Sequence, residues 1–386
     1  MKVVFITNFY NHHQAALAHA LYQMLEGNFA FIQTQAIPEE RLALGYAAKH
    51  DEPFLYDYAL QKETCDAWLE AADVLMFGQA STKFLRSAAR RKQIVLHYSE
   101  RPLKDGPEWH KYIPRVIKWH KAYATAKQNY LLAAGAYTAK EYRRFFLYRH
   151  RAYTWGYFPN TYRYDPAESL VSAKDKASIL WCGRLLDWKH PDDALTVASR
   201  LKKEGYRFSL TVVGVGNMEA ALLGRIAEEG LEAEVRMVGA VDAESVRDYM
   251  ERAGIFLMTS DEKEGWGVVL NEAMNSGCAV VASHAAGGAP ILLRQNDNGY
   301  LYPSGNTEAL YERVKYLLDH PEEQERLGLS AYRTVTEHWN AETAAERLIT
   351  LIRCMMDGDV YPMPYTDGIC SPALLLSEKE QSFKIL

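Results

Sequence analysis

The chain has 386 residues, of which 48% are hydrophobic and 24% are charged, and its formal net charge is −5. Such a length is typical of two domains, and the composition excludes collagenous and low-complexity chains. No apolar run approaches the roughly 20 residues that a helix needs to cross a bilayer. The opening run 1–7 is too short for a signal peptide, so we expect a first strand there.

Strand-like and helix-like patterns alternate through the first part of the chain. The sequence predicts a helix at 14–26 and strands at 2–7, 73–77, 93–96, 130–133 and 152–155. Such alternation predicts a mostly parallel sheet with helices on both faces. A Pro-, Gly- and Tyr-rich segment without periodicity follows, and we place an interdomain linker at 157–176.

A second alternating series occupies residues 177–340. Strands are predicted at 178–182, 209–213, 234–238, 254–258 and 279–282, and helices near 190–203, 217–229, 243–252, 266–276, 308–319 and 322–337. Residues 341–386 are expected to form a C-terminal helix and a tail that can cross back to the first domain, 1–156. We therefore expect two doubly wound α/β domains, whose ligands bind at the carboxyl ends of the strands.

Two carboxylates stand eight residues apart near the two-thirds point of the chain. Glu264 follows a strand-like apolar run, and Glu272 lies among core residue types, where a lone carboxylate costs several kcal/mol unless a polar group meets it. Gly265 and Gly267 leave room for a ligand at the start of the predicted helix, where anions bind. The pattern favours a nucleotide-sugar site; the alternative is a solvated Glu264 and a Glu272 paired with a core arginine.

Two cations precede the first predicted helix of the second domain. Arg184 can bind phosphate oxygens bidentately and Lys189 adds a point charge. Because the helix dipole disfavours positive charge at a helix start, phosphate binding is favoured over two idle surface cations. Gly214-x-Gly216 is a weaker signal, for either a tight turn or the approach of a ligand. Val241, after a further strand, could lie against a base.

The order of these motifs resembles the donor half of a family 4 glycosyltransferase, a retaining enzyme class with the GT-B fold, in which two Rossmann-like domains face across a cleft. The resemblance covers about 178–318. It rests on Gly183-Arg184, Lys189, Gly214-x-Gly216, Gly239, Glu264 and Glu272, Gly277 with Cys-Ala-Val-Val-Ala-Ser, Gly287-Gly288 and Asn298-Gly299. The acidic residue that often follows the paired glycines is absent, because Ala289-Pro290 stands there.

The resemblance implies a role for each donor-side residue. Arg184 and Lys189 would hold the diphosphate, Glu272 would bind ribose hydroxyls and Glu264 would touch the transferred sugar. Phosphate or sugar contacts are further implied for the backbone N–H groups of Gly267, Val268 and Val269.

The implied activity is transfer of a hexosyl unit from a nucleoside diphosphate sugar to an acceptor hydroxyl, without a metal or other cofactor, in cell-surface polysaccharide or glycolipid assembly. Residues 1–156 would bind the acceptor and 177–340 the donor. A sugar-nucleotide epimerase of the same fold and a non-catalytic sugar-nucleotide-binding protein are the alternatives. Asp357-Gly-Asp359 has a metal-binding form, but we interpret it as a helix stop.

The first half departs from the family pattern in the loop after its first strand. Asn11, His12 and His13 stand where many members carry a glycine-rich loop. Amides and imidazoles suit sugar hydroxyls, although Asn11 could instead cap the following helix.

A further candidate is His97, directly after the predicted strand 93–96. Its position resembles that of a histidine which the family often places near the transferred sugar; a structural histidine is the alternative. Glu100 and Arg101 could contact sugar or acceptor, or pair with each other.

Residues 74–155 hold 17 basic against four acidic residues, whereas the remainder holds 27 against 45. Aromatic residues interleave with the cations. The basic residues within 83–151 favour an anionic membrane surface or a phosphate-bearing acceptor, with an idle solvated face as the alternative and nucleic acid disfavoured for lack of a motif. The five cysteines, odd in number and without a Cys-x-x-Cys pair, are typical of a reduced protein. We therefore expect a cytoplasmic chain, free or peripheral at the inner face of the membrane.

Overall fold

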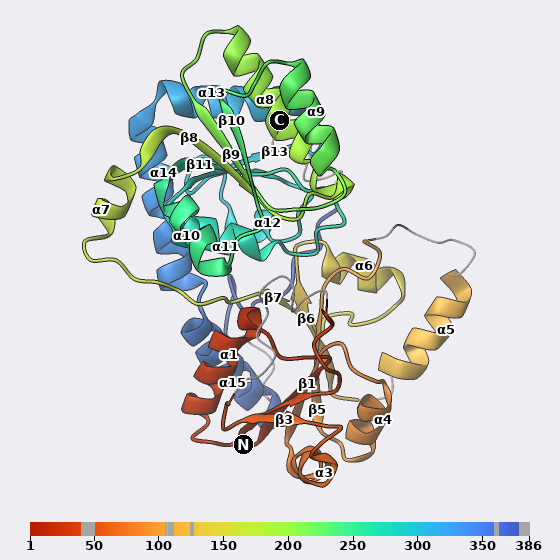
Figure 1. Cartoon of the computed structure of the whole chain (residues 1–386). Coiled ribbons are helices and arrows are strands. Elements are labelled where there is room, and N and C mark those ends of the chain that lie inside the picture. Colours follow the sequence, from red (N-terminus) through yellow and green to blue (C-terminus); the bar gives the residue numbers. More distant parts are fainter. Residues whose placement is uncertain (40–50, 105, 107–111, 124–126, 359–362, 378–386) are drawn as a thin grey trace. The chain divides into compact units, whose positions relative to one another are not determined.

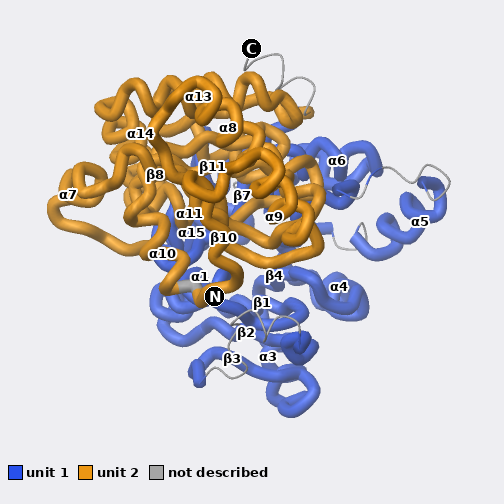
Figure 2. The backbone as a smooth tube through the Cα atoms, turned by 45° about the horizontal axis from the view of Figure 1, so that its top comes forward, with its two compact units in different colours: residues 1–160, 339–376 blue, residues 161–338, 377–386 orange. Residues whose placement is uncertain are grey.

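A computed structural model describes residues 1–39, 51–104, 106, 112–123, 127–358 and 363–377. The chain divides into two compact units (Figure 2). Unit 1 contains Met1–Asn160 and Trp339–Leu376, and unit 2 contains Thr161–His338. Over the described ranges, no helix is both long and apolar enough to cross a membrane. All five cysteines are free thiols.

Unit 1 is built on a seven-stranded parallel sheet in the order β3-β2-β1-β4-β5-β6-β7. Its strands are β1 Val3–Thr7, β2 Phe29–Gln33, β3 Leu55–Asp57, β4 Val74–Phe77, β5 Ile94–Ser99, β6 Asn129–Ala134 and β7 Ala152–Trp155. Its helices are α1 His12–Met24, α3 Lys62–Ala71, α4 Lys83–Arg90, α5 Tyr112–Tyr123, α6 Thr138–Arg144 and α15 Ala341–Asp357 (Figure 1). The strands read as continuous apolar runs because helices cover both faces of the sheet.

The helix α15 belongs to unit 1 although it follows unit 2 in the sequence. It packs against α1. Asn340 caps its start, accepting a hydrogen bond from the N–H of Thr343 at 2.8 Å, and Gly358 ends it in the left-handed conformation with φ 81°. The predicted helix stop at 357–358 is therefore confirmed, whereas Asp359 lies outside the described residues.

Unit 2 is built on a six-stranded parallel sheet in the order β10-β9-β8-β11-β12-β13. Its strands are β8 Asp175–Cys182, β9 Ser209–Val213, β10 Val235–Gly239, β11 Ala253–Met258, β12 Ala279–Ser283 and β13 Tyr300–Tyr302. Its helices are α7 Ala167–Ser172, α8 Pro191–Lys203, α9 Glu219–Glu228, α10 Ala243–Arg252, α11 Val268–Asn275, α12 Ala289–Leu292, α13 Thr307–Asp319 and α14 Pro321–Arg333, with the short 3-10 turn η2 Asp187–Lys189 and the π-helical turn Thr334–His338. Both sheets are doubly wound, as the sequence predicts.

The direction of winding reverses between β8 and β11, which are neighbours in the sheet but not in the sequence. Loops that follow the two strands at such a switch point diverge and leave a crevice for a ligand. In unit 2 these are the loops 183–190 and 259–267. They contain the two predicted cations and Glu264.

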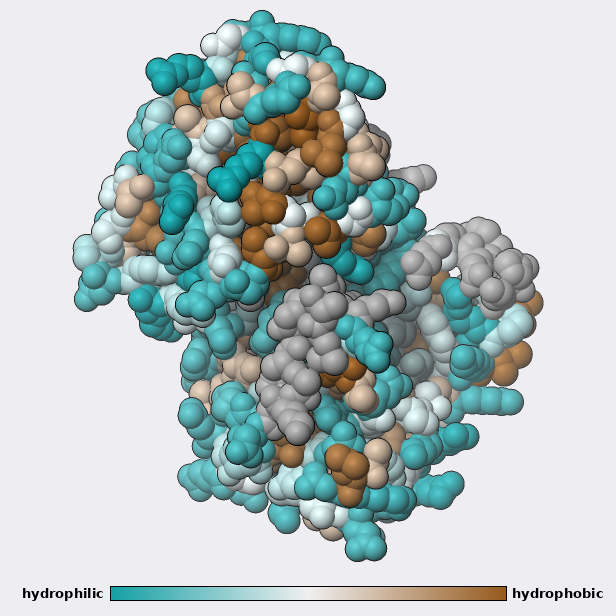
Figure 3. Space-filling view, in the orientation of Figure 1, coloured by the Kyte–Doolittle hydropathy of each residue, from teal (hydrophilic) through white to brown (hydrophobic). Residues whose placement is uncertain are grey.

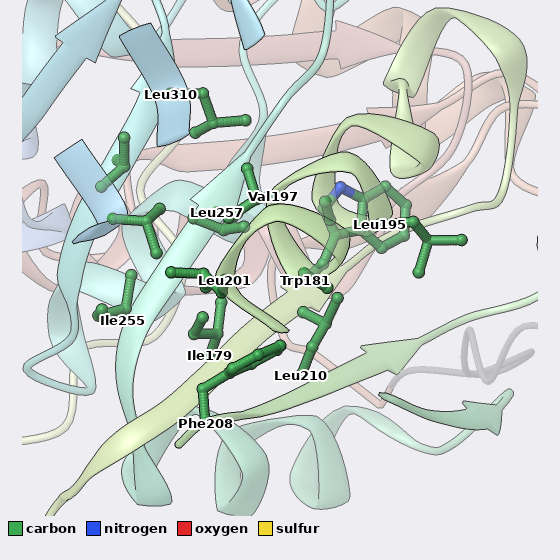
Figure 4. Packing of buried hydrophobic residues seen from close by; sticks show 14 of the residues in the cluster. Ile179, Trp181, Leu195, Val197, Leu201, Phe208, Leu210, Ile255, Leu257 and Leu310 are labelled. Atoms are coloured by element: carbon green, nitrogen blue, oxygen red, sulfur yellow. The ribbon is translucent and has the colours of Figure 1, made fainter. Parts of the chain in front are cut away.

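An apolar core fixes this end of the sheet (Figure 4). Its members come from β8, β9, β11, α8, α13 and the loop before β9, and include Ile179, Trp181, Leu195, Val197, Leu201, Phe208, Leu210, Ile255, Leu257 and Leu310. Each such side chain contributes about 1.5–3 kcal/mol on full burial. Trp181 also donates its indole N–H to Thr259 Oγ1 at 2.8 Å. The core is thereby tied to the loop after β11.

Candidate active site

The loops at the carboxyl end of the second sheet are joined to one another by backbone hydrogen bonds. The loop after β8 is hydrogen-bonded to the end of β9 and the loop that follows it. The loop after β11 is hydrogen-bonded to the loop after β8 and to the loop after β12. The N–H to carbonyl pairs are Gly183 to Val213 (3.0 Å), Leu185 to Val215 (2.9 Å), Asp261 to Trp188 (2.9 Å), Gly287 to Glu264 (3.0 Å) and Gly288 to Trp266 (3.0 Å). The backbone of the site is therefore held in place before any ligand arrives.

Close backbone packing explains the glycines of Gly214-x-Gly216. A Cβ atom on Gly214 would lie 1.9 Å from the carbonyl oxygen of Gly183, and one on Gly216 would lie 2.2 Å from that of Leu185. The tight-turn interpretation therefore accounts for both glycines without a ligand. A ligand contact at Gly216 stays a prediction.

Lys189 and Glu264 form an ion pair. The Lys189 Nζ lies 2.5 Å from Glu264 Oε2, and the two side chains are 12% and 14% exposed. Ser260 Oγ lies 3.4 Å from the same carboxylate oxygen. Thr259 Oγ1 donates to the backbone carbonyl of Lys189 at 2.6 Å, which fixes the end of η2 where the lysine stands. The side chain predicted to bind the diphosphate, Lys189, and the side chain predicted to touch the sugar, Glu264, are thus in direct contact in the free protein.

Glu272 stands in the second turn of α11 and is half-buried. Burial raises the pKa of its carboxyl group to about 7, and the positive charge of Arg247 opposes that rise. Arg247 itself pairs with Glu251 at 2.9 Å. Over the described ranges, the Glu272 carboxylate has no hydrogen-bond or ion-pair partner, so the alternative of a core ion pair is not found.

Cys182 lies at the end of β8, and the charges of Glu272 and Lys189 both affect its thiol. Burial raises the pKa of its thiol to about 12; the charge of Glu272 acts in the same direction and that of Lys189 against it. Sequence patterning did not indicate this thiol, which carries no motif.

The N-terminus of α11 is open. Gly267 stands before it with φ 90°, a backbone conformation that favours glycine, and a Cβ atom at this position would have to displace the end of the Met258 side chain, whose Cε would lie 2.0 Å away. Among the residues that the structure describes, no side chain caps the helix. Within the described part of the chain, the N–H groups of Val268 and Val269 have no acceptor, whereas that of Leu270 bonds the Gly267 carbonyl at 2.9 Å. These are the orphan donors that bind anions at helix starts.

Arg184 is exposed in the loop after β8. Its guanidinium has no hydrogen-bond or ion-pair partner among the described side chains and carbonyls. Val241 is half-buried in the loop between β10 and α10, and its proposed contact with a base stays a prediction. The site thus combines unpaired donors for an anion with carboxylate acceptors for hydroxyl groups.

The loop after β1 in unit 1 contains Asn11, His12 and His13. The Asn11 side chain accepts a hydrogen bond from the N–H of His13 at 3.0 Å and so caps α1. The rings of His12 and His13 lie 3.9 Å apart at the first turn. The capping alternative for Asn11 is confirmed, and sugar contacts by the three residues stay predictions.

The prediction that His97 stands in a loop after a strand is wrong. The strand β5 continues to Ser99, and His97 lies inside it with 4% exposure. Its ring stacks on Tyr123 at 4.5 Å, and Nδ1 lies 2.8 Å from the Tyr148 hydroxyl. Burial lowers the pKa of His97 to about 3, so the ring is neutral. An enclosed, neutral imidazole has no free face for a sugar.

Glu100 and Arg101 do not pair with each other. Arg101 is buried and binds Glu141, with Nη2 at 2.5 Å from Oε1, while Glu141 also accepts the N–H of Leu103 at 2.9 Å. Glu100 accepts a hydrogen bond from the Tyr157 hydroxyl at 2.9 Å. The ion pair fixes the loop after β5, which makes Arg101 a structural residue and leaves Glu100 as the accessible group there.

Comparison with known proteins gives a partial match in sequence and a wider match in fold. Residues 166–334 match the family model Glycosyl transferases group 1. The amylovoran biosynthesis glycosyltransferase AmsK of Erwinia amylovora is 32% identical over 179 residues, 45% of this chain and 44% of AmsK. A putative colanic acid biosynthesis glycosyltransferase, WcaL of Salmonella typhimurium, is 28% identical over 177 residues, 44% of this chain and 43% of WcaL. The matched region therefore spans less than half of these relatives.

Among solved structures, the Anabaena protein HepE in complex with UDP and glucose is similar, with a TM-score of 0.64 and 14% identity over 92% of this chain and 99% of HepE. The S. aureus protein TarM gives a TM-score of 0.64 at 11% identity. Identity this low bears on the fold alone. The chain has the GT-B fold of two Rossmann-like domains, and its residues 166–334 match the family model of the group 1 glycosyl transferases.

Proposed function

We propose that the protein transfers a sugar from a nucleoside diphosphate sugar to an acceptor hydroxyl in polysaccharide assembly. The observation that carries the proposal is the grouping of Lys189, Glu264 and the unpaired N–H groups of α11 at the switch point of the second sheet. The relatives that act in amylovoran and colanic acid biosynthesis support the choice of acceptor class.

The diphosphate would bind between the Arg184 guanidinium, the Lys189 ammonium and the N–H groups of Val268 and Val269. As the bond from the sugar to the diphosphate breaks, negative charge grows on the leaving phosphate. Fixed donors aimed at that charge stabilise the transition state more than the ground state. These four groups would therefore supply much of the rate.

The two carboxylates would have separate tasks. Glu272, half-buried and without a hydrogen-bond or ion-pair partner over the described ranges, would accept hydrogen bonds from the ribose hydroxyls. Glu264 would accept hydrogen bonds from hydroxyls of the transferred sugar. Donor binding would then draw Lys189 from Glu264 toward the phosphate, because the two negative groups compete for one ammonium.

The finer assignments rest on the family resemblance. We propose retention at the anomeric carbon, with the leaving phosphate assisting removal of the acceptor proton, and transfer of a hexose without a metal ion. UDP is the first nucleotide to test, because the similar HepE structure holds UDP. Val241 and Gly216 are proposed to line the nucleotide.

The test begins with thermal unfolding in the presence of UDP, GDP, ADP and dTDP, since a ligand that binds only the folded state raises the melting temperature. The matching nucleotide sugar is then incubated with acceptor candidates, with and without EDTA, and the anomeric configuration of the product is read by NMR. Acceptor-linked sugar supports the proposal. Free nucleotide without linked sugar, or a donor whose sugar has been altered, contradicts it.

A further inference from the structure

The helices α4 and α5 of unit 1 contact each other and turn one side of each to solvent. On α5 the inner side is aromatic: Tyr112, Val116, Trp119 and Tyr123 pack against a core cluster of unit 1. This packing settles the rotation of the helix about its axis. Residues half a turn away must therefore face outward.

The outward side of α5 carries apolar and basic residues beside one another. Ile113 and Ile117, one turn apart, are 70% and 51% exposed. Lys118 and Lys121 on the same side are exposed as well. Figure 3 shows hydrophobic atoms on the outer side of this helix bordered by hydrophilic ones. Two neighbouring isoleucines left in water are a cost that a partner surface would remove.

The outward side of α4 is basic. Phe84, Leu85 and Ala88 are buried, which leaves Arg86 and Arg90 exposed one turn apart. Over the described ranges, neither guanidinium has a hydrogen-bond or ion-pair partner. Uncompensated cations in this arrangement are available to phosphate groups.

Two hollows join the helices into one surface. The first, of about 350 Å³, is lined by basic residues of α4 and its C-terminal end, Lys83, Arg86, Arg90 and Arg91. Asp66 also lines it, but its carboxylate is held by Lys62 at 2.5 Å and by the Tyr58 hydroxyl at 3.0 Å. The second, of about 730 Å³, is lined by both isoleucines, Lys118, Lys121 and again Arg86. Arg86 thus lines both the basic hollow and the more apolar one.

We propose that the α4–α5 surface, defined as Arg86, Arg90, Ile113, Ile117, Lys118 and Lys121, docks on an anionic lipid bilayer. The cations would bind lipid phosphates and the isoleucines would enter the boundary of the acyl chains. A surface helix that exposes apolar and basic residues side by side can lie in the membrane interface in this way. A soluble polyanion would satisfy the cations but would leave the isoleucines exposed.

Vesicle flotation tests the proposal with the whole chain. Vesicles of phosphatidylcholine with phosphatidylglycerol should carry the protein upward at about 0.1 M salt, and vesicles of phosphatidylcholine alone should not. Raising the salt to about 1 M should release it, because the screening length falls from about 10 Å to about 3 Å.

Two double variants separate the two contributions. Arg86→Gln with Arg90→Gln should lower the partition coefficient roughly 30-fold, since each cation near an anionic membrane contributes about fivefold. Ile113→Ser with Ile117→Ser should lower it about tenfold or more, while binding of inorganic polyphosphate should not change. Matched controls in unit 2, Lys203→Gln with Arg252→Gln and Leu223→Ser, replace exposed residues of the same kinds and should float as wild type does. Circular dichroism and thermal melts confirm that each variant is folded.

Three results would overturn the proposal. One is the absence of flotation with anionic vesicles at low salt. Another is flotation that the isoleucine variant does not weaken while polyphosphate binds well, which would make the surface a site for a soluble phosphate ligand. The third is an equal loss in the unit 2 controls, which would mean unspecific attraction. None of these outcomes depends on transferase activity, so membrane docking is tested independently of the proposed function.

Discussion

Replacing Lys189 by alanine should weaken the binding of a nucleoside diphosphate, and the free protein sets the size of the effect. A hydrogen bond to a charged group contributes about 1.5–3 kcal/mol, and about 1.4 kcal/mol corresponds to tenfold in affinity. In the free protein, however, the ammonium already lies 2.5 Å from Glu264. Binding exchanges one anionic partner for another, so part of the gain is lost. We therefore expect Lys189→Ala to weaken UDP binding roughly 10- to 30-fold.

The exchange can be measured separately with Glu264→Gln. This change frees Lys189 from its carboxylate partner, so UDP, which carries no sugar, should bind as tightly as to wild type or more tightly. A donor that carries its sugar should be turned over poorly, because the acceptor for the sugar hydroxyls is weakened. The double variant then gives the coupling energy of the pair.

Isothermal titration calorimetry with UDP is the assay. Lys263→Ala is the matched control, because Lys263 lies in the same loop and its side chain is exposed. If Lys189→Ala binds UDP as wild type does, the assignment of Lys189 to the diphosphate is refuted. Equal losses in the two lysine variants would mean that overall charge, rather than position, governs affinity.

Three further outcomes are expected. Gly214→Ala should lower the free energy of unfolding by more than about 1 kcal/mol, because the new Cβ would lie 1.9 Å from the Gly183 carbonyl oxygen. Gly224→Ala is the control within α9, where a Cβ atom would have no neighbour within 4 Å, and it should raise the free energy of unfolding by about 0.5–1 kcal/mol. Thermal melts of both variants test the two expectations. His97→Phe should keep turnover near that of wild type and cost about 1 kcal/mol of stability through the lost contact with Tyr148, and a loss of turnover by orders of magnitude in a folded variant would restore a catalytic role. The folded-state pKa of Glu272, about 7, lies above its ordinary 4.5, so its contribution to stability is full below pH 4.5 and is lost as the pH rises through 7; urea titrations should show a loss of up to about 3 kcal/mol that is missing in Glu272→Gln.

Much of the fold could be predicted from the sequence, because each central strand is a buried apolar run between helical stretches. The predicted strand 209–213 coincides with β9, and 152–155 coincides with β7. The missed elements include the short edge strands β3 and β13, the strand β2, the four-residue helix α12 and the small helix α7, which lies in the segment predicted to lack periodicity. Runs of three to six residues carry too little periodicity to separate them from loops.

The position of the candidate site could be predicted from the sequence, but the ion pair between Lys189 and Glu264 could not. Lys189 and Glu264 are each recognisable beside a strand end, yet they are 75 residues apart, and their contact depends on β8 and β11 being neighbours at the switch point. The prediction that His97 lies in a loop was wrong for a related reason. A histidine at the end of an apolar run looks like a loop residue, and only the aromatic rings of other elements show that the strand continues through it.

The contrast between the two carboxylates leads to a last prediction. Glu264 has its partner in the free protein, whereas Glu272 has a pKa of about 7 because burial disfavours its charge. Ribose hydroxyls that donate to this carboxylate would stabilise its ionised form and lower that pKa. Nucleotide binding at pH 6 should therefore release close to one proton, and at pH 9, where the group is already ionised, it should release none.

Calorimetry in buffers of different ionisation enthalpy counts this proton. UDP-glucose is a suitable probe, because its diphosphate has no group that titrates near neutral pH, unlike the terminal phosphate of UDP. Glu272→Gln should abolish the release while it weakens binding. Uptake of a proton near pH 8, where most of this group is ionised in the free protein, would mean instead that the diphosphate lies close enough to raise the pKa of Glu272 further. In that case the ribose would be held elsewhere, and Glu272 would face the phosphates as a neutral acid.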